Sequence, residues 1–304
     1  MLICATTNII GRVMLSQRVF ESVDEELGKF KDVLKELMTG AAMFNIGDFV
    51  PGIGWMDLPR RRREWGARTS LILFWLAIEL RDDDGEKLSD VNIRALLSVP
   101  GTDTSTIIVE WALAELIKNP TILKQLQSEM DAIIGQERIL QEDDVSNLPY
   151  LQAVCKEALR LHASTPLSIP HYSFESCEVE GYHIPTDTRL LINIWAIGRD
   201  PDIWENPLEF VPERFLPCGK AVNIEPHGTD FEMITFGAGR RICVGKQAGM
   251  VFVQYLVGVL VQGFNWQMPK GEEIDLKESP GLVIPKAVSI KAFVTPRLAS
   301  KAYF

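Results

Sequence analysis

The sequence has no excess of positive charge, and its one basic run, residues 60–63, lies in a loop-like stretch. The 304 residues carry a formal net charge of −10 at pH 7. A nucleic-acid-binding protein needs a basic face, so the charge argues against a nucleic-acid partner. The remaining composition, 46% hydrophobic and 24% charged, is that of an ordinary globular protein.

Cysteine is scarce: the chain has five, an odd number, and no two are arranged as a C-x-x-C pair. This excludes the usual zinc-binding spacings and argues against a disulfide framework. The sequence also has no acceptor site for N-linked glycosylation. We therefore expect the thiols to lie in a reducing compartment.

Long hydrophobic runs are missing too. The two longest, residues 71–78 and 250–261, fall short of the roughly twenty residues that a membrane-spanning helix needs. The first residues lack the layout of a secretory signal peptide. We expect both runs to be buried helices and no membrane anchor in this chain.

What the sequence does contain is a helical period over most of its length and short strand signals later on. The expected helices are two within residues 1–45, then 69–80, 89–118 with a break at Pro100-Gly101, 121–135, 145–162 capped by Ser146 or Asn147, and one after residue 245. The expected strands are a hairpin over 176–184 turning at Glu180-Gly181, a strand over 189–194 and a tail strand over 284–295. This predicts a single domain, residues 1–304, that is mainly α with small β-sheets.

Residues 236–245 form a Gly- and Arg-rich loop around Cys243, just before the apolar run at 250–261. Glycines let backbone N–H groups approach the sulfur, arginines supply positive charge, and the following helix offers its N-terminus. These features favour a bound, anionic sulfur of the kind that ligates haem iron. A lone cysteine is more often simply buried in a turn. A dinucleotide-binding turn is excluded because Ile242 stands where its third glycine should be.

The loop fits the pattern F-x-x-G-x-R-x-C-x-G, whose fixed positions are Phe236, Gly239, Arg241, Cys243 and Gly245. Three more patterns accompany it: E-x-x-R at 157–160, P-E-R-F at 212–215 and Gly-Thr-Asp-Thr at 101–104. In this combination and order the sequence resembles the cytochrome P-450 monooxygenases. The resemblance implies that fold, of which this chain would carry the C-terminal two-thirds, without the anchor and first helices.

The resemblance also implies a haem b cofactor. Cys243 would supply the axial thiolate, and Arg241 would pair with a haem propionate through its guanidinium. Phe236 would keep the sulfur side of the site dry, and Gly239 would shape the loop. His171 stands where relatives often have an arginine that reaches a propionate, and it could do so only when protonated.

The E-x-x-R pattern places Glu157 and Arg160 three residues apart on one helix face, close enough to pair. Arg214 of the P-E-R-F element would join them in a partly buried scaffold under the haem. The ordinary alternative is a surface pair worth a few tenths of a kcal/mol.

Asp103 and Thr104 lie in the expected central helix. In the family such residues relay protons to dioxygen, whereas in an arbitrary helix they bond back to their own carbonyls. The sequence departs from the family at Pro100, since a proline inside a helix costs about 3 kcal/mol or more. A haem-thiolate isomerase or dehydratase is an alternative function, but such enzymes tend to lose the relay residues, and both are present here.

From about residue 86 onward the sequence resembles the plant flavonoid B-ring hydroxylases, and residues 294–298 and Tyr303 look more like the 3′,5′- than the 3′-hydroxylases. This implies flavanone and dihydroflavonol substrates, O2, and electrons from NADPH through a cytochrome reductase. The positions that border substrate would be Thr165, Leu167, Leu282 and Val283. An intact relative is anchored in the endoplasmic reticulum membrane, facing the cytosol. The alternatives are a truncated, inactive haem-thiolate fragment and a 3′-hydroxylase.

Overall fold

The computed structural model describes residues 90–243 and 245–303, with side chains from Asp103 onward. The helices predicted within 1–45 and 69–80 lie outside the described residues. The chain divides into two compact units: residues 1–106 with 280–283, and residues 107–279 with 284–304. The second unit carries the cysteine loop.

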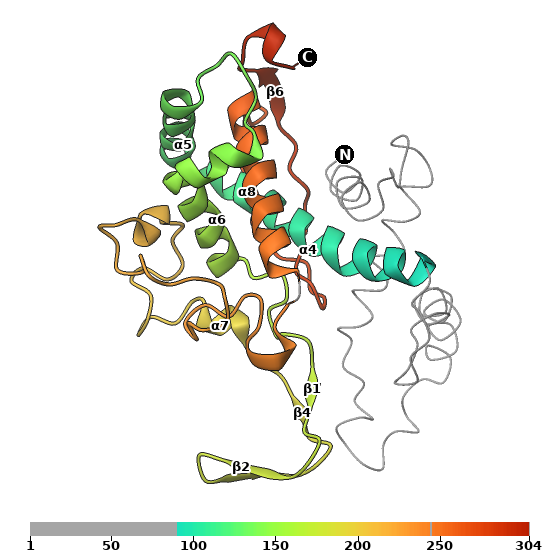
Figure 1. The fold of residues 1–304 in the computed structure, drawn as a ribbon. Helices are drawn as coiled ribbons and strands as arrows, with labels where there is room; N and C mark the ends of the chain where they lie inside the picture. Colours follow the sequence, from blue (N-terminus) through green and yellow to red (C-terminus); the bar gives the residue numbers. More distant parts are fainter. Residues whose placement is uncertain (1–89, 244, 304) are drawn as a thin grey trace. The chain divides into compact units, whose positions relative to one another are not determined.

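The described elements are mostly helical, which confirms the predicted fold class (Figure 1). In chain order they are α4 (Asp90–Lys118), α5 (Pro120–Ile133), the 3₁₀ helix η3 (Glu142–Asn147), α6 (Pro149–Leu161), β1 (His171–Tyr172), β2 (Cys177–Val179), β3 (Tyr182–Ile184), β4 (Arg189–Leu190), α7 (Ile194–Ile197), the 3₁₀ helices η4 (Pro212–Phe215) and η5 (Gly239–Arg241), α8 (Lys246–Gly263), β5 (Phe264–Gln267), β6 (Phe293–Pro296) and the 3₁₀ helix η6 (Ser300–Tyr303).

The central helix α4 is continuous, so the predicted break at Pro100-Gly101 is wrong. A proline removes one N–H donor, but the remaining helical hydrogen bonds can persist on both sides of it. The C-terminal half of α4 is also fixed by burial, since Val109, Ala112 and Leu116 are fully buried. Packing of this half therefore outweighs the local cost of the proline.

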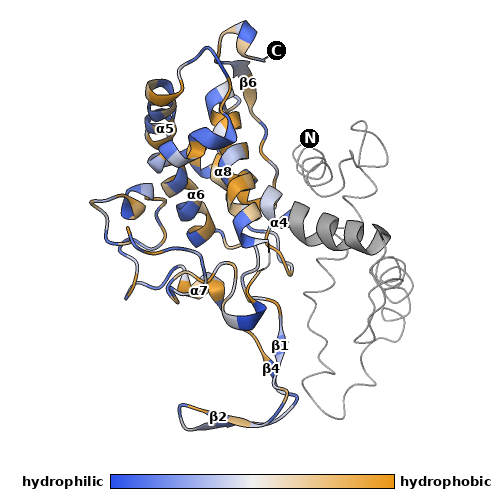
Figure 2. Cartoon of the chain, in the orientation of Figure 1, coloured by the Kyte–Doolittle hydropathy of each residue, from blue (hydrophilic) through white to orange (hydrophobic). Residues whose placement is uncertain are grey.

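Helices α5, α6 and α8 pack together to form the core of the second unit (Figure 1). Figure 2 shows hydrophobic and hydrophilic bands along α5, as expected of an amphipathic helix, and its Leu126 and Met130 are buried. Helix α8 approaches its neighbours closely at Gly258, where a Cβ atom would lie 2.9 Å from Leu140 Cδ1 and 3.1 Å from Leu151 Cδ2. A larger residue at this position would require the Leu140 and Leu151 side chains to shift.

One buried amide connects α8 to the chain after α5. Gln262, in the last turn of α8, is fully buried. Its Oε1 accepts from Leu140 N at 2.7 Å, and its Nε2 donates to the carbonyls of Gly135 and Arg138 at 3.2 and 3.1 Å. One side chain thus satisfies three backbone groups of a segment that forms no sheet ladder.

Helix α6 starts at Pro149, later than the predicted 145–162, because residues 142–147 form the separate 3₁₀ helix η3. Neither Ser146 nor Asn147 caps it. Instead the carboxylate of Glu129, on α5, accepts from the backbone N–H groups of Tyr150 at 2.7 Å and Leu151 at 3.1 Å. The first turn of α6 is capped by a neighbouring helix rather than by its own sequence.

The sheets are small, antiparallel and two-stranded: β1 pairs with β4, β2 with β3, and β5 with β6. The predicted hairpin is confirmed, with Glu180 and Gly181 at positive φ in its turn, and it extends away from the helices (Figure 1).

Two predicted strands are wrong in extent. In 189–194 only Arg189–Leu190 is a strand, because the Asn193 side chain accepts from Ala196 N at 3.0 Å and caps α7. In the tail, Lys286 forms one bridge with Glu278, and regular pairing starts at Phe293.

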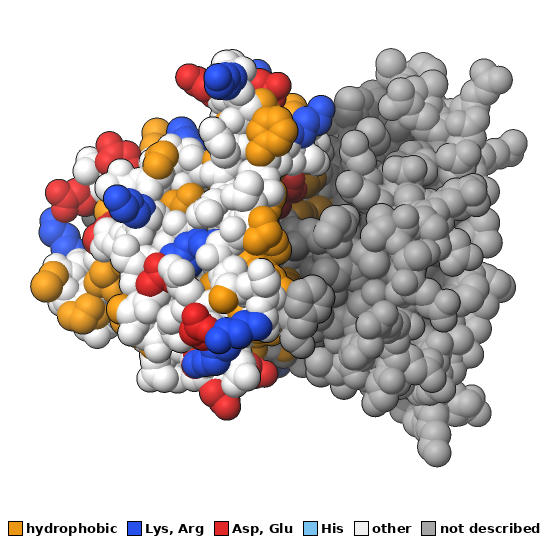
Figure 3. Space-filling view, turned by 90° about the horizontal axis from the view of Figure 1, so that it is seen from above, with side chains coloured by type: hydrophobic (Ala, Val, Ile, Leu, Met, Phe, Trp, Pro, Cys, Tyr) orange, Lys and Arg blue, Asp and Glu red, His pale blue; other side chains and the backbone are white. Residues whose placement is uncertain are grey.

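None of the helices in the described residues combines the length and the apolarity that a membrane span needs. On the face shown in Figure 3, acidic, basic and hydrophobic side chains of the described part are interspersed. Opposite charges therefore alternate on this face instead of forming a patch of one sign.

Candidate functional site

The cysteine loop is held by its own backbone. Gly237 N donates to Ile234 O at 2.8 Å, Ile242 N to Gly239 O at 3.2 Å, and Cys243 N to Phe236 O at 2.9 Å. Gly237 and Gly239 adopt φ values of 75° and 67°, a region that other residues enter only with strain. The pattern of glycines is thus required by the turns that bring Cys243 back beside Phe236.

The loop ends at the N-terminus of α8, which begins at Lys246. The first turn of this helix packs on the Phe236 ring, since a Cβ at Gly249 would lie 3.6 Å from it. The Lys246 side chain donates to the carbonyl of His227 at 3.2 Å and ties the helix start to the preceding segment.

Cys243 is exposed and forms no disulfide. Its thiol therefore lies just ahead of a helix N-terminus, whose partial positive charge favours an anion. Arg241 is also exposed, two residues earlier, where its guanidinium can reach a carboxylate. The donor set fits a haem group: one accessible sulfur for the iron and a cation for a propionate, on a loop whose Phe236 ring packs on the first turn of α8.

The E-x-x-R and P-E-R-F elements meet in a buried network. Glu157 accepts from Arg160 Nε and Nη2, both at 2.8 Å, from Arg214 Nε at 3.0 Å and from Val211 N at 2.9 Å. The side chains of Glu157 and Arg160 are fully buried. The structure thus brings together the three residues predicted to form a scaffold.

Both arginines also bind the chain between α7 and η4. Arg160 Nη1 donates to Pro207 O at 2.8 Å, and Arg214 Nη1 donates to Glu205 O at 2.8 Å. Carbonyls of an irregular segment thereby obtain partners that no ladder supplies. The network fixes the course of residues 198–211.

The other predicted residues occupy separate places. His171 is half-buried in β1, paired with Leu190 of β4. Thr165 and Leu167 are half-buried in the loop after α6, and their carbonyls accept from Ser168 N at 3.2 Å and Ile192 N at 3.3 Å. Asp103, Thr104, Leu282 and Val283 belong to the first unit, whereas the cysteine loop lies in the second. Their roles stay predictions.

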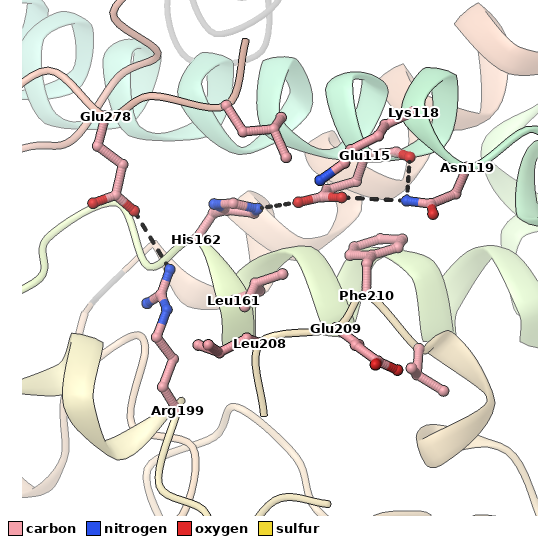
Figure 4. A pocket seen from close by; sticks show the side chains of 12 residues that line it. Glu115, Lys118, Asn119, Leu161, His162, Arg199, Leu208, Glu209, Phe210 and Glu278 are labelled. Atoms are coloured by element: carbon pink, nitrogen blue, oxygen red, sulfur yellow. Dashed lines mark hydrogen bonds and ion pairs between the residues drawn. The ribbon is translucent and has the colours of Figure 1, made fainter. Parts of the chain in front are cut away.

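Sequence reasoning missed a polar pocket of about 430 Å³ in the second unit, shown in Figure 4. Its buried centre is the pair His162–Glu115, with Nε2 and Oε1 2.8 Å apart. Arg199 and Glu278, whose Nη2 and Oε1 are 3.4 Å apart, lie on its other side. No spacing rule could have linked Glu115 to His162, because they are 47 positions apart and meet only after α4 and α6 pack.

Burial controls the electrostatics of this pocket. Desolvation lowers the pKa of His162, and the hydrogen bond and charge of Glu115 oppose that shift. Desolvation also lowers the pKa of Arg199 to about 10, against the opposing charge of Glu278. His162 Nδ1 is buried and forms no hydrogen bond within the described part of the chain. An ionised carboxylate only accepts hydrogen bonds, so His162 Nε2–H is the donor in the contact with Glu115.

The amino-acid sequence matches a known protein family and individual proteins of known function. The family model "Cytochrome P450" matches residues 60–291. The flavonoid 3′,5′-hydroxylase 2 of Petunia hybrida is 49% identical over 100% of this chain and 65% of its own length. The flavonoid 3′-monooxygenase of Arabidopsis thaliana is 44% identical over 97% of this chain and 64% of its own length. The chain thus spans slightly less than two thirds of the length of these relatives.

Solved structures agree with the sequence comparison. A zebra fish cytochrome P450 with abiraterone has a TM-score of 0.74 and 25% identity, covering 97% of this chain and 71% of its own. A zebra fish cytochrome P450 with progesterone has a TM-score of 0.73 and 25% identity, covering 97% of this chain and 70% of its own. Family membership implies a haem cofactor with cysteine thiolate ligation. Sequence, fold and cysteine loop together show that the chain belongs to the cytochrome P450 family.

Proposed function

We propose that this chain carries the haem-binding part of a monooxygenase that hydroxylates the B-ring of flavonoids, of the 3′,5′-hydroxylating type. The single observation that carries the proposal is the accessible thiol of Cys243, which lies just ahead of the N-terminus of α8 and whose backbone N–H donates to the Phe236 carbonyl. The identity of 49% to a flavonoid 3′,5′-hydroxylase supports the substrate class.

Each predicted residue has a task in this proposal. Cys243 holds the iron, and Arg241, with protonated His171, binds propionate carboxylates. Phe236 excludes water beside the sulfur, and Gly239 gives the loop its turn. When bound, the haem supplies the activation of dioxygen.

The scaffold of Glu157, Arg160 and Arg214 holds the segment 198–211 in place. Asp103 and Thr104, on α4, hold and pass on protons through a carboxyl and a hydroxyl.

The proposed partners follow from the same family. Flavanones and dihydroflavonols are the substrates, bordered by Thr165, Leu167, Leu282 and Val283, and dioxygen is the co-substrate. Electrons come from NADPH through a separate cytochrome reductase. The intact protein acts at the cytosolic face of the endoplasmic reticulum membrane.

The test begins with the ligand. We expect the haem-loaded chain, reduced and exposed to carbon monoxide, to show the red-shifted Soret band of thiolate ligation. Cys243→Ser should abolish that band, whereas Cys177→Ser, which changes another exposed free cysteine, should keep it. A histidine-type band in the parent chain, or an unchanged band in C243S, refutes the assignment of Cys243.

Product analysis then tests the reaction. With reductase, NADPH and the flavanone naringenin, we expect B-ring hydroxylation at both the 3′ and 5′ positions. A single hydroxylation at 3′ would replace the 3′,5′-type by the 3′-type.

A second candidate, a haem-thiolate protein that does not turn over, is favoured by Pro100, which lies in α4 three residues ahead of Asp103. A thiolate-type band without substrate-dependent consumption of NADPH would establish it.

A further inference from the structure

The loop after α6 has little regular structure but carries two residues of the proposed substrate contact, Thr165 and Leu167. Its second half is held by the segment after β4, because Ile192 N donates to Leu167 O at 3.3 Å and Trp195 N donates to Pro166 O at 3.0 Å. The first half, residues 162–165, has to be fixed from another side.

Trp111, on α4, holds that first half through His162. The two rings are stacked, with centroids 4.1 Å apart and planes 3° from parallel. The indole is 1% exposed and the imidazole is fixed in its plane by the Glu115 carboxylate 2.8 Å away. Two residues on α4, one helical turn apart, therefore fix the residue at which α6 ends and the loop begins.

A second connection runs through Ile284. Trp111 Nε1 donates to Ile284 O at 3.0 Å, and Ile284 N donates to Ser164 O at 2.9 Å. The segment that follows is also fixed, because Lys286 Nζ lies 4.9 Å from the centroid of the Trp111 ring and Ala287 N donates to Lys277 O at 2.8 Å. The indole N–H is thus the first member of a hydrogen-bonded chain that ends on the residue before Thr165.

We propose that Trp111 is a positioning residue, which sets the place of the Ser164–Thr165 backbone and thereby how tightly and in which orientation the flavonoid is held. This inference rests on the proposed function, but no part of it requires Trp111 to touch substrate or haem. A tryptophan that only filled the core would stabilise the fold without affecting the loop selectively.

The test compares two substitutions of the same kind. Trp111→Phe removes the indole N–H and keeps an aromatic ring for His162. Trp266→Phe, in β5, removes an equivalent bond, from Trp266 Nε1 to Leu260 O at 3.0 Å near the C-terminal end of α8. Loss of one partly buried hydrogen bond should lower the unfolding midpoint in both variants.

Only W111F should affect the loop. We expect the dissociation constant of naringenin, measured from the change in haem absorption on titration, to rise on the order of threefold to tenfold. Amide hydrogen exchange should become faster in residues 163–168, and the ratio of 3′ to 3′,5′ products should change. W266F should leave all three quantities as in the parent chain.

The outcomes separate the two proposals. If the parent chain binds naringenin and W111F binds it equally well, or if exchange in 163–168 is unaltered, only the positioning role is overturned. Equal effects in W266F overturn it too. If the parent does not bind naringenin at all, the proposed function fails and the positioning role fails with it.

A second variant covers the case in which W111F does not fold. His162→Gln keeps a donor for Glu115 but removes the ring on which Trp111 stacks. It should weaken naringenin binding and speed exchange in 163–168 in the same direction, and unchanged values would overturn the proposal.

Discussion

At the scale of single residues, Glu157 shows how one buried carboxylate can hold in place a segment without regular secondary structure. Its carboxylate binds two arginines and one backbone N–H; the side chains of Glu157 and Arg160 are fully buried and that of Arg214 is 9% exposed. The arginines in turn bind carbonyls of the segment before η4. Removing the carboxylate would leave two buried cations without their anion, and that costs more than the pair itself contributes.

Glu157→Gln should therefore lower the free energy of unfolding by about 3–5 kcal/mol. Denaturant titration followed by circular dichroism measures this. The matched control is Lys220→Ala, which removes an exposed pair with Glu205 and should leave the midpoint unchanged. A loss in E157Q no larger than that of K220A would show that the network does not fix the fold.

The buried His162 predicts a pH dependence. Burial holds its pKa below the ordinary 6.5 in the folded chain, despite the opposing carboxylate of Glu115. Below about pH 6.5 the unfolded chain therefore binds a proton that the folded chain does not. The contribution of His162 to stability is complete above pH 6.5 and is lost as the pH falls from there toward the lowered value.

Unfolding free energies between pH 7.5 and 5 should accordingly decrease with a shallower slope in His162→Gln than in the parent chain. His183→Gln, an exposed histidine of β3, should keep the slope of the parent. Parallel curves for parent and H162Q would contradict the lowered pKa.

At the scale of elements, the helices were easier to predict than their ends. Apolar periodicity predicted α5, because burial of one helix face is written locally in the sequence, and the apolar run at 250–261 predicted α8. The start of α6 was missed because its cap, Glu129, lies on another helix and is not a neighbour in sequence. The strand over 189–194 was too long because a short apolar run does not distinguish a strand from the start of a helix.

Substituting Glu129 tests whether its carboxylate caps the N-terminus of α6. Glu129→Ala should lower the free energy of unfolding by about 1 kcal/mol, the usual value of an N-cap. Amides of Tyr150 and Leu151 should lose protection from hydrogen exchange. The control Glu137→Ala, an exposed residue after α5, should change neither quantity. Unchanged protection at both amides in E129A would refute the capping role.

At the scale of the whole molecule, the fold class and the cysteine loop could be predicted from the sequence, and the pocket at His162 could not. The loop depends on residues within ten positions of one another, so its glycines, arginine and cysteine form a local pattern. The contacts of Glu115, His162, Arg199 and Glu278 arise from four separate segments and depend on the packing of all of them.

Haem should stabilise the chain as a whole. A ligand that binds only the folded state adds about 2.7 kcal/mol at a concentration one hundred times its dissociation constant. The thermal unfolding midpoint should therefore rise with added haem in the parent chain and in Cys177→Ser, and much less in Cys243→Ser. A concentration-independent midpoint in the parent chain would contradict specific binding.

Gln262 has a consequence for anyone who redesigns this protein. Because α8 is rich in valine and leucine, a design guided by hydropathy would replace Gln262 by leucine. Leucine at this position would leave the Leu140 N–H without its acceptor and the carbonyls of Gly135 and Arg138 without their donor. Redesign of this helix by hydrophobicity alone would therefore destabilise the segment 135–140, which Gln262 supports.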